Sequence, residues 1–352
     1  MHIRKPRLGR RKPANHLGFT LVELLVAMAV FLVIGGAAVS LVRAHIPLVS
    51  SQQNQAGLNM AMRNAVAQMQ IDTVNAGTGY YQGVNIPAWP IGITIANSAA
   101  GANCYNAATF TYGAGCFDTM NIIVTDESTL PSTPSGNGTS CVSTTASTLF
   151  ASPVGATTLA ELAASFHAGD QLLLLKSDGS QMTTTILSTD GQVTGGKVQL
   201  QHNPTAANGL NTSANDPLLI TQSGDANKLG EQFCTGDWIL KLSPITYSVD
   251  ATDNTNPKLV RTQAGVSTVI SEQIIGFKAG ASIWNGTTDA AYNFDASTYG
   301  YDFALVRAVR VSVIGRTTPD WLNKQRNTFD QGPYRVESVS VVVNPRNLSM
   351  NQ

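Results

Sequence analysis

Residues 18–42 form one apolar run, GFTLVELLVAMAVFLVIGGAAVSLV, in which Glu23 is the one ionisable side chain. The 24 residues from Phe19 to Val42 would make a helix of about 36 Å, which can cross a hydrocarbon core of about 30 Å with some tilt. A carboxylate inside such a span costs about 2.5–3.5 kcal/mol unless a partner compensates it. Because the span contains no Lys, Arg or His, we expect that partner to come from outside it.

The segment before the run is strongly basic. Residues 1–18 carry no Asp or Glu, and their basic residues are Arg4, Lys5, Arg7, Arg10, Arg11 and Lys12. Because basic flanks of a membrane helix stay in the cytoplasm, we expect a single-pass membrane protein with its N-terminus inside the cell. Removing these six leaves 16 of the 22 Lys and Arg residues against 22 Asp and Glu. The resulting negative charge disfavours nucleic acid as a partner.

Gly18, Phe19 and Glu23 resemble the processing site of type IV prepilins and of the pseudopilins of type II secretion. In that pattern Gly precedes the cut, Phe follows it, and Glu is the fifth mature residue. The resemblance implies that residues 1–18 are a leader removed by a prepilin peptidase and that the Phe19 amine is then methylated. It also implies that Glu23 pairs with an N-terminal amine during filament assembly. The alternative is an uncleaved signal anchor with a stray acidic residue.

A helical pattern continues beyond the apolar run. Apolar residues recur at three- to four-residue spacing, at Leu58, Met62, Ala65 or Val66, and Met69. We therefore expect one long helix with a transmembrane half at 19–42 and an extramembrane half at 43–77. It should end near Asn75-Ala76-Gly77, with Gly77 as its C-cap.

Two points weaken this helix. The pair Gly35-Gly36 lowers helix propensity, and Pro47 removes a backbone donor and clashes one turn back. In filaments of the resembled class this part of the helix is often locally melted, so the resemblance implies a break. The alternative is a pair of ordinary membrane-helix glycines and a simple kink.

Residues 78–352 show mostly strand patterns, so we expect an α+β fold: a long N-terminal transmembrane helix followed by a β-rich periplasmic or extracellular head. Leu240 and Leu242 change phase to Ile245 and Tyr247 across Pro244, which predicts a bulge or an edge strand. The expected strands are 121–125, 170–176, 182–187, 197–201, 238–249, 258–262, 272–277, 304–314 and 334–343.

A Ser/Thr-rich insertion around 126–160 interrupts the strand pattern. From Ser128 to Thr148, 12 of 21 residues are Ser or Thr, with Pro and Gly interspersed. This composition predicts an exposed loop, with a contact surface as the alternative. Charged residues make up only 12% of the chain, against about 25% in typical soluble domains, so a hydroxyl-rich surface of an exported protein is expected.

Cys104, Cys116, Cys141 and Cys234 all follow the apolar run and would lie in an oxidising compartment, where disulfides form. Four cysteines allow three pairings. We prefer Cys104 with Cys116, which closes a short Gly-rich loop, and Cys141 with Cys234. Buried free thiols are the alternative.

Motifs for catalysis or cofactor binding are absent from the sequence. The His residues are scattered, and no His-Glu-x-x-His pair, paired CxxC, Gly-x-Ser-x-Gly elbow or phosphate-binding loop occurs. Residues 250–256, DATDNTN, are rich in oxygen ligands but lack EF-hand spacing, so a polar turn is preferred to a Ca²⁺ site. We therefore expect no enzyme, no cofactor and no metal site.

The later strands carry a second, weaker resemblance, to minor pilins of the PilW family. The blocks that resemble this family, in order, are 169–175, 238–250, 258–261, 306–316 and 344–348. Residues 78–165 lie outside the resemblance, and a function particular to this chain could lie there.

The PilW resemblance implies a minor pilin that takes part in priming a type IV pilus and sits at its tip, moving from the inner membrane to the cell surface. Its partners would be major and minor pilins, met through the N-terminal helix, the prepilin peptidase and the inner-membrane assembly platform. The alternatives are a type II secretion pseudopilin, a pilus-associated adhesin whose insertion binds a ligand, and a membrane-tethered hydrolase.

Overall fold

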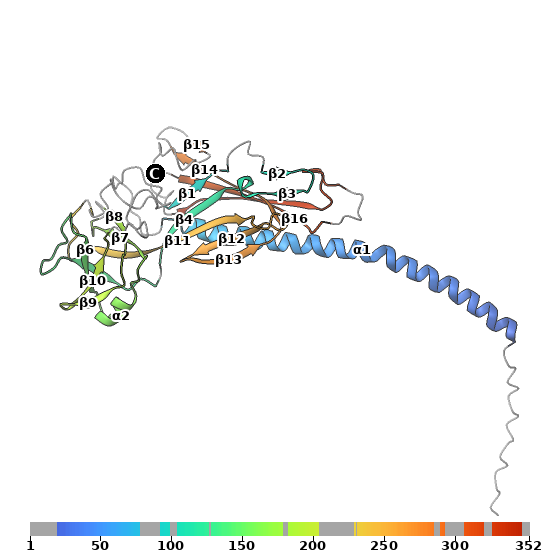
Figure 1. Ribbon diagram of the computed structural model, residues 1–352, viewed down its shortest axis with the longest axis horizontal. Coiled ribbons are helices and arrows are strands. Elements are labelled where there is room, and N and C mark those ends of the chain that lie inside the picture. The colour runs from blue at the N-terminus through green and yellow to red at the C-terminus, as the bar shows by residue number, and fades with distance from the viewer. Residues whose placement is uncertain are drawn as a thin grey trace, which may run out of the picture. The chain divides into compact units, whose positions relative to one another are not determined.

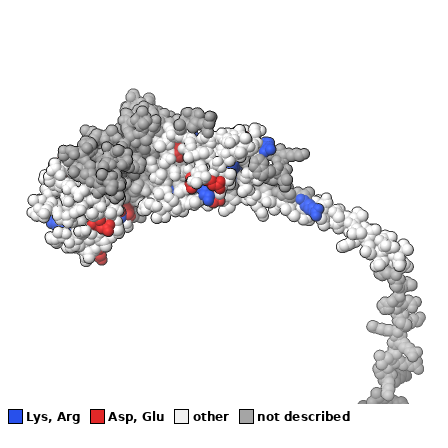
Figure 2. Space-filling view, in the orientation of Figure 1, with Lys and Arg blue, Asp and Glu red and all other residues white. Residues whose placement is uncertain are grey.

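The computed structural model describes residues 20–77, 92–98, 104–126, 128–178, 182–203, 229, 231–284, 289–292, 306–319 and 326–346. It confirms the α+β class, because one long helix is followed by a strand-rich region (Figure 1). The chain forms two compact units, Met1–Asn54 and Gln55–Gln352. Figure 2 shows a face on which most of the described residues are uncharged, as the composition predicts.

Helix α1 spans Leu21–Val74 and belongs to both units. Its first part, Leu21–Arg43, is long and apolar enough to cross a membrane, and none of that span is buried within the protein. The helix continues through Gly35-Gly36 and Pro47, so the break implied by the resemblance is not present. A Cβ at either glycine would meet nothing within 4 Å, so close packing inside this chain does not require glycine there.

Helix α1 ends at Val74, close to the end predicted near 75–77. Gly77 has the backbone conformation of the predicted C-cap but a different hydrogen-bond partner. Gly77 has a φ of 72°, which is the left-handed conformation that glycine adopts after a helix. Its N–H donates to the carbonyl of Ile123 in strand β4 (Thr119–Thr125) at 2.8 Å, and not to a carbonyl of α1. Gly77 therefore turns the chain and fastens the helix end to a sheet.

Two sheets of the second unit lie around the second half of α1. The larger has the order β1-β4-β11-β12-β13, with β7 pairing to the first half of β11 and β8 pairing to β7. The other has the order β15-β14-β16-β17. Their bounds are β1 (Ile93–Ala96), β4, β7 (Gln171–Leu175), β8 (Met182–Ile186), β11 (Trp238–Asp250), β12 (Lys258–Gln263), β13 (Val266–Ser271), β14 (Ile274–Trp284), β15 (Asp289–Tyr292), β16 (Val306–Arg316) and β17 (Val336–Val343).

The predicted apolar stripe of α1 is buried against these sheets. Leu58, Met62, Ala65, Val66 and Met69 are each less than 9% exposed. A Cβ added at Gly315 of β16 would lie 2.8 Å from atoms of both Leu58 and Met62. The glycine therefore permits the helix to approach β16 closely.

A buried carboxylate fixes the last turns of α1 to the larger sheet. Asp72 is 7% exposed, and its Oδ2 accepts hydrogen bonds from the Tyr247 hydroxyl of β11 at 2.5 Å and from Arg261 Nε of β12 at 2.7 Å. Burial and then the neighbouring carboxylate raise the pKa of Tyr247 well above its usual range. Tyr247 therefore remains a neutral donor in this network.

An inserted lobe separates two strands that lie side by side. Strands β4 and β11 are antiparallel neighbours, with Thr125 opposite Leu242, yet residues 126–237 come between them in the chain. Much of this insertion folds on its own core, which is distinct from the core around α1. We call residues 128–237 the inserted lobe. Its elements are β5 (Ser132–Ser135), β6 (Thr148–Pro153), helix α2 (Leu159–Ala164), β7, β8, β9 (Gln192–Thr194) and β10 (Lys197–Gln201).

The prediction of an exposed Ser/Thr-rich loop is wrong for part of that stretch. Ser132–Ser135 form strand β5, all four residues are buried, and β5 pairs with β6. The Thr133 hydroxyl accepts a hydrogen bond from Gly236 N at 2.6 Å. The hydroxyls of Ser132 and Ser135 are buried without a hydrogen-bond partner among the described residues. Pairing of β5 with β6 therefore buries this stretch although only one of its three hydroxyls is hydrogen-bonded, and composition alone did not reveal this.

The prediction of a bulge or an edge strand at Pro244 is also wrong. Strand β11 is central, and its register with β4 continues without a shift from Leu242 to Tyr247. Pairing with β7 stops at Leu242 and pairing with β12 starts at Ile245. Pro244 lies in the interval that neither strand covers, so its missing N–H interrupts neither of those ladders.

The structure pairs Cys104 with Cys116 and Cys141 with Cys234, which are the pairings preferred from the sequence. None of the four cysteines is free. The first bridge closes the loop that holds the hairpin of β2 (Tyr105–Asn106) and β3 (Thr111–Tyr112) and the 3-10 turn Ala114–Cys116. The second joins the beginning and the end of the inserted lobe.

A buried histidine should make the stability of the inserted lobe depend on pH. His202 is 1% exposed, and burial lowers its pKa from 6.5 to about 4. Between these values the unfolded chain binds more protons than the folded chain, so stability present above pH 6.5 is lost as the pH falls, by about 3 kcal/mol near pH 4. Urea unfolding followed from about pH 7 to about pH 4 would measure this loss.

The matched controls are two glutamine variants. His202→Gln should flatten the pH dependence, whatever its own effect on stability, because the slope reports the titrating group. His167→Gln, at a side chain that is 64% exposed, is the matched histidine substitution elsewhere in the lobe. An equal slope in the wild type and in His202→Gln would contradict the prediction.

Candidate functional site

The candidate site is the N-terminal turn of α1. Of the residues predicted there, Gly18 and Phe19 lie outside the described residues, and Glu23 is in the first turn of the helix. Thr20 precedes the first helical residue, Leu21, and so occupies the N-cap position. The four residues Thr20 to Glu23 therefore decide how the described part of the site is built.

Thr20 and Glu23 form a capping box. The Glu23 Oε2 accepts hydrogen bonds from Thr20 N and from Thr20 Oγ1, both at 2.9 Å, and Glu23 N donates to Thr20 Oγ1 at 3.3 Å. These bonds satisfy backbone donors that the first turn of a helix leaves without an intrahelical partner. The positive end of the helix dipole also favours a carboxylate at this position.

The local partner changes one expectation from the sequence. The absence of cations in the run led us to seek every partner of Glu23 outside it, yet Thr20 supplies two hydrogen bonds to the carboxylate. The signal for this was present, because Thr-x-x-Glu is a capping-box pattern. Hydrogen bonds to Thr20 leave the negative charge itself unneutralised, so a cationic partner is still required in lipid.

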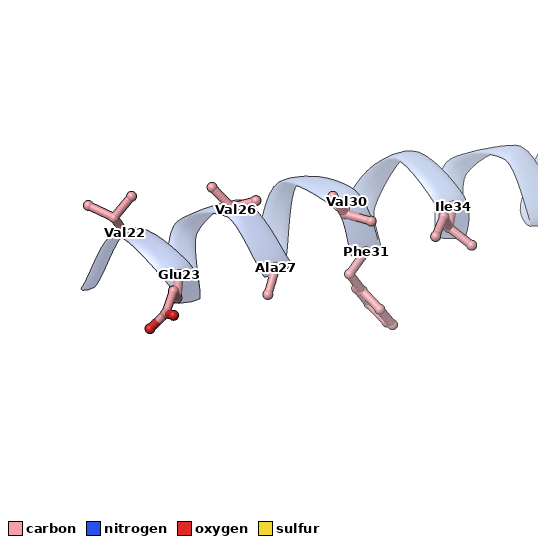
Figure 3. Close-up of a pocket in the computed structure, with 7 residues that line it drawn as sticks. All are labelled: Val22, Glu23, Val26, Ala27, Val30, Phe31 and Ile34. Atoms are coloured by element: carbon pink, nitrogen blue, oxygen red, sulfur yellow. The ribbon is translucent and has the colours of Figure 1, made fainter. Parts of the chain in front are cut away.

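A shallow apolar groove runs along the helix from Glu23. Its lining residues are Val22, Glu23, Val26, Ala27, Val30, Phe31 and Ile34. Figure 3 shows Glu23, Ala27 and Phe31 on one side of the helix, with Val22 and Val26 on another. The small side chain of Ala27 leaves a notch between the carboxylate and the Phe31 ring, which is 75% exposed. This geometry fits a packed neighbouring helix that presents a cation near Glu23.

The oxygen-rich stretch 250–256 forms a polar turn. Asp250 Oδ1 accepts a hydrogen bond from Thr252 N at 2.9 Å, and Asp253 Oδ1 accepts from Thr255 N at 3.0 Å. Hydrogen bonds from the hydroxyls of Thr252 and Thr255, and then those from their backbone N–H groups, lower the pKa of Asp250 and Asp253. Among the described residues, no group of three or more His, Cys, Asp or Glu could hold a metal ion.

Comparison with known proteins places the N-terminal region in a recognised class. Residues 13–39 match the prokaryotic N-terminal methylation motif. No curated protein and no solved structure matches the chain. The motif, the exposed apolar helix and the strand-rich region after it support a type IV pilin-like prepilin. This class is anchored in a membrane by its N-terminal helix and associates with prepilin peptidase machinery.

Proposed function

We propose that the chain is a minor pilin of the PilW type, a structural subunit without catalytic activity that takes part in priming a type IV pilus. The observation that carries the proposal is a capped carboxylate, Glu23, on an exposed apolar helix and within the matched methylation motif. Such a charge is costly in lipid unless a second subunit neutralises it. The partners of the proposed minor pilin are other pilins, which it contacts through α1, and the assembly platform.

The inserted lobe supports a minor role at the filament tip. A subunit repeated along a shaft must fit against copies of itself on several sides, whereas a tip subunit has a side without neighbours. The lobe has its own core and its own disulfide. It is connected to the sheet that packs on α1 through the ends of the paired strands β4 and β11. A lobe of this size is accommodated most easily where one side of the head meets no neighbour.

A type II secretion pseudopilin is the second candidate, because it shares the anchor and the processing motif. Deleting the gene separates the two. Loss of surface pili with normal secretion supports the pilus assignment, and loss of secretion with normal piliation supports the pseudopilin.

Processing is the direct test of the class. The mature chain should begin at Phe19 with a methylated amine, because a cut between Gly18 and Phe19 discards all six basic leader residues and frees an amine close to Glu23. Mass spectrometry of the membrane-extracted protein measures the N-terminus. An intact Met1 start in cells that contain the peptidase would contradict the proposal, and a bulky residue in place of Gly18 should block cleavage.

The inserted lobe should be dispensable for docking through α1. Replacing residues 127–240 with Asn-Gly would join Asp126 to Lys241, whose backbones already meet, because Asp126 N donates to Lys241 O at 2.7 Å. Asn-Gly suits the two-residue turn of a hairpin. We expect leader cleavage and recovery of partner pilins to persist, as measured by pull-down. Loss of partner recovery with normal membrane levels would show that the lobe takes part in docking.

A further inference from the structure

Strand β17 is the edge of its sheet. It is last in the order β15-β14-β16-β17, and among the described strands it pairs with β16 alone. With eight residues it is the longest edge strand of the described sheets, since β13 has six, β8 has five and the other edge strands have four or fewer. The outer main-chain N–H and C=O groups of an edge strand are open to pairing with another chain.

The edge of β17 lacks the features that normally prevent such pairing, which are charges, proline, bulges and short length. Its register with β16 is unbroken over all eight residues, whereas the register of β13 with β12 shifts at Leu259. The charged residue of β17, Glu337, lies near the start of the strand and accepts a hydrogen bond from Gln55 Nε2 at 2.6 Å. Residues 338–343 contain no charged residue and no proline.

Apolar side chains on both faces of β17 are incompletely buried. On one face, Val339 and Val341 pack against the core around α1 but are only half-buried. On the other face, Val342 is 54% exposed, and Ser338 and Ser340 are exposed beside it. An additional strand would cover these valines and remove more apolar surface from water. The edge therefore presents both main-chain hydrogen bonds and apolar contacts to an extended chain.

The size of this edge limits what it can hold by itself. At about 3.3 Å per residue the strand is about 26 Å long, and a sheet with its side chains is about 10 Å thick. Pairing along β17 would thus bury about 500 Å² in total, against about 1,200–2,000 Å² for a stable interface between two proteins. The edge is therefore too small to hold a second copy of the chain unaided, and it suits a partner that another contact already holds.

Helix α1 provides that other contact. Within the second unit, Gln55 of α1 bonds Arg335 and Glu337 at the start of β17. Beyond Gln55 the helix presents large apolar side chains to solvent, because Met60 is 67% exposed and Ile71 is 58% exposed. A subunit that packs along this part of α1 would therefore lie within reach of the β17 edge.

We propose that β17 accepts an additional β-strand from the head of a neighbouring pilin that is packed along α1. The inference rests on the proposed function and names the surface by which the partner is recognised. The added strand is uncharged, its main-chain groups pair with the outer edge of β17, and its apolar side chains cover Val339, Val341 and Val342. The sheet then continues from one subunit into the next, and the register of the two strands fixes how the two heads are aligned.

Photocrosslinking of the full chain in cells of its native host tests this contact. The photoreactive residue p-benzoylphenylalanine replaces Val342, and mass spectrometry identifies the crosslinked peptides. We expect a crosslink from position 342 to a strand in the head of another pilin. The matched control is the same replacement at Val193, a valine of the edge strand β9 that is 52% exposed, and it should give no crosslink to a pilin.

The same photoreactive residue at Met60 of α1 reports on the proposed function. A pilin crosslink from Met60 without one from position 342 would overturn the inference and leave the proposed function intact. A crosslink from position 342 to a second copy of this chain, or to a protein that is not a pilin, would also overturn the inference. No pilin crosslink from either position would contradict the proposed function together with the inference.

A pair of proline variants tests the main-chain hydrogen bonds. In an antiparallel ladder alternate residues direct their N–H toward the neighbouring strand, so one of the adjacent residues Ser338 and Val339 bonds β16 and the other points outward. Of Ser338→Pro and Val339→Pro, the variant that loses an outward N–H should keep its pairing with β16. It is recognised by normal membrane levels, and its crosslink from position 342 should fall about tenfold. An undiminished crosslink in that variant would overturn the proposal.

Discussion

Glu23→Ala should abolish recovery of partner pilins and surface pili while leaving membrane insertion and leader cleavage intact. The span inserts without that carboxylate, and its removal relieves an insertion cost of about 2.5–3.5 kcal/mol. Docking should fail because the cation of a neighbouring subunit would then lie in lipid without an opposite charge, at a cost of about 3–5 kcal/mol. That cost corresponds to a loss of association of at least about a hundredfold.

The capping box allows two further variants that separate the charge of Glu23 from its hydrogen bonds with Thr20. Glu23→Gln keeps an N3 side chain that can close the box and removes only the charge. Thr20→Ala keeps the charge and removes the hydroxyl that bonds to Glu23. If charge drives docking, Glu23→Gln should fail as Glu23→Ala does, and Thr20→Ala should retain most partner recovery.

Pull-down of partner pilins and counts of surface pili, with membrane levels as the reference, measure these outcomes. Glu23→Asp, which keeps the charge on a shorter side chain, should give an intermediate result. Normal piliation in both Glu23→Ala and Glu23→Gln would show that the carboxylate has no part in assembly, even with the Phe19 N-terminus verified.

Asp72→Ala should destabilise the second unit by about 3–5 kcal/mol. It removes the carboxylate that is the shared acceptor of the half-buried Arg261 and the buried Tyr247. Thermal or urea unfolding of the chain from about Gln52 onward, secreted in oxidised form, would measure the loss. Asp72→Asn keeps one acceptor oxygen without the charge, so it should cost less.

A double-mutant cycle separates the network from general packing. Tyr247→Phe removes one donor with little change in volume, so Asp72→Ala in that background should cost less than it does alone. The reduction is the coupling energy of the pair. Strictly additive effects would show that Asp72 does not act through Tyr247.

The sequence predicts those features that depend on local pattern. The spacing from Leu58 to Met69 placed the buried face of α1, and alternation from Leu305 to Val343 placed β16 and β17. Each of the nine expected strands overlaps a strand of the structure. The unpredicted elements are β1, β2, β3, β5, β6, β9, β13, β15 and α2. Most of these are short, and β13 is exposed along most of its length, so their residues show little apolar periodicity.

The site was predictable only in part, for a physical reason. Glu23 was evident because a charge inside an apolar run is costly. Its bond to Thr20 was not predicted, although the Thr-x-x-Glu spacing indicates a capping box. Asp72, Asp330 and Arg316 could not be found in this way, because their partners are distant in the chain, at Tyr247, Tyr112 and Phe110 among others. No local sequence pattern distinguishes a buried polar residue on a helix or loop from an exposed one.

The position of the inserted lobe sets an order of events in folding. Strand β4 cannot pair with β11 until the chain between them closes, and the entropy lost in closing a loop rises with the logarithm of its length. Once the bridge between Cys141 and Cys234 has formed, only the short segments 126–141 and 234–237 still separate the two strands. This shortening lowers the closure cost by about 1.5 kcal/mol. Oxidation of the lobe therefore favours completion of the sheet that receives α1, so a thiol oxidant outside the membrane would raise the share of subunits whose helix is packed on a complete sheet.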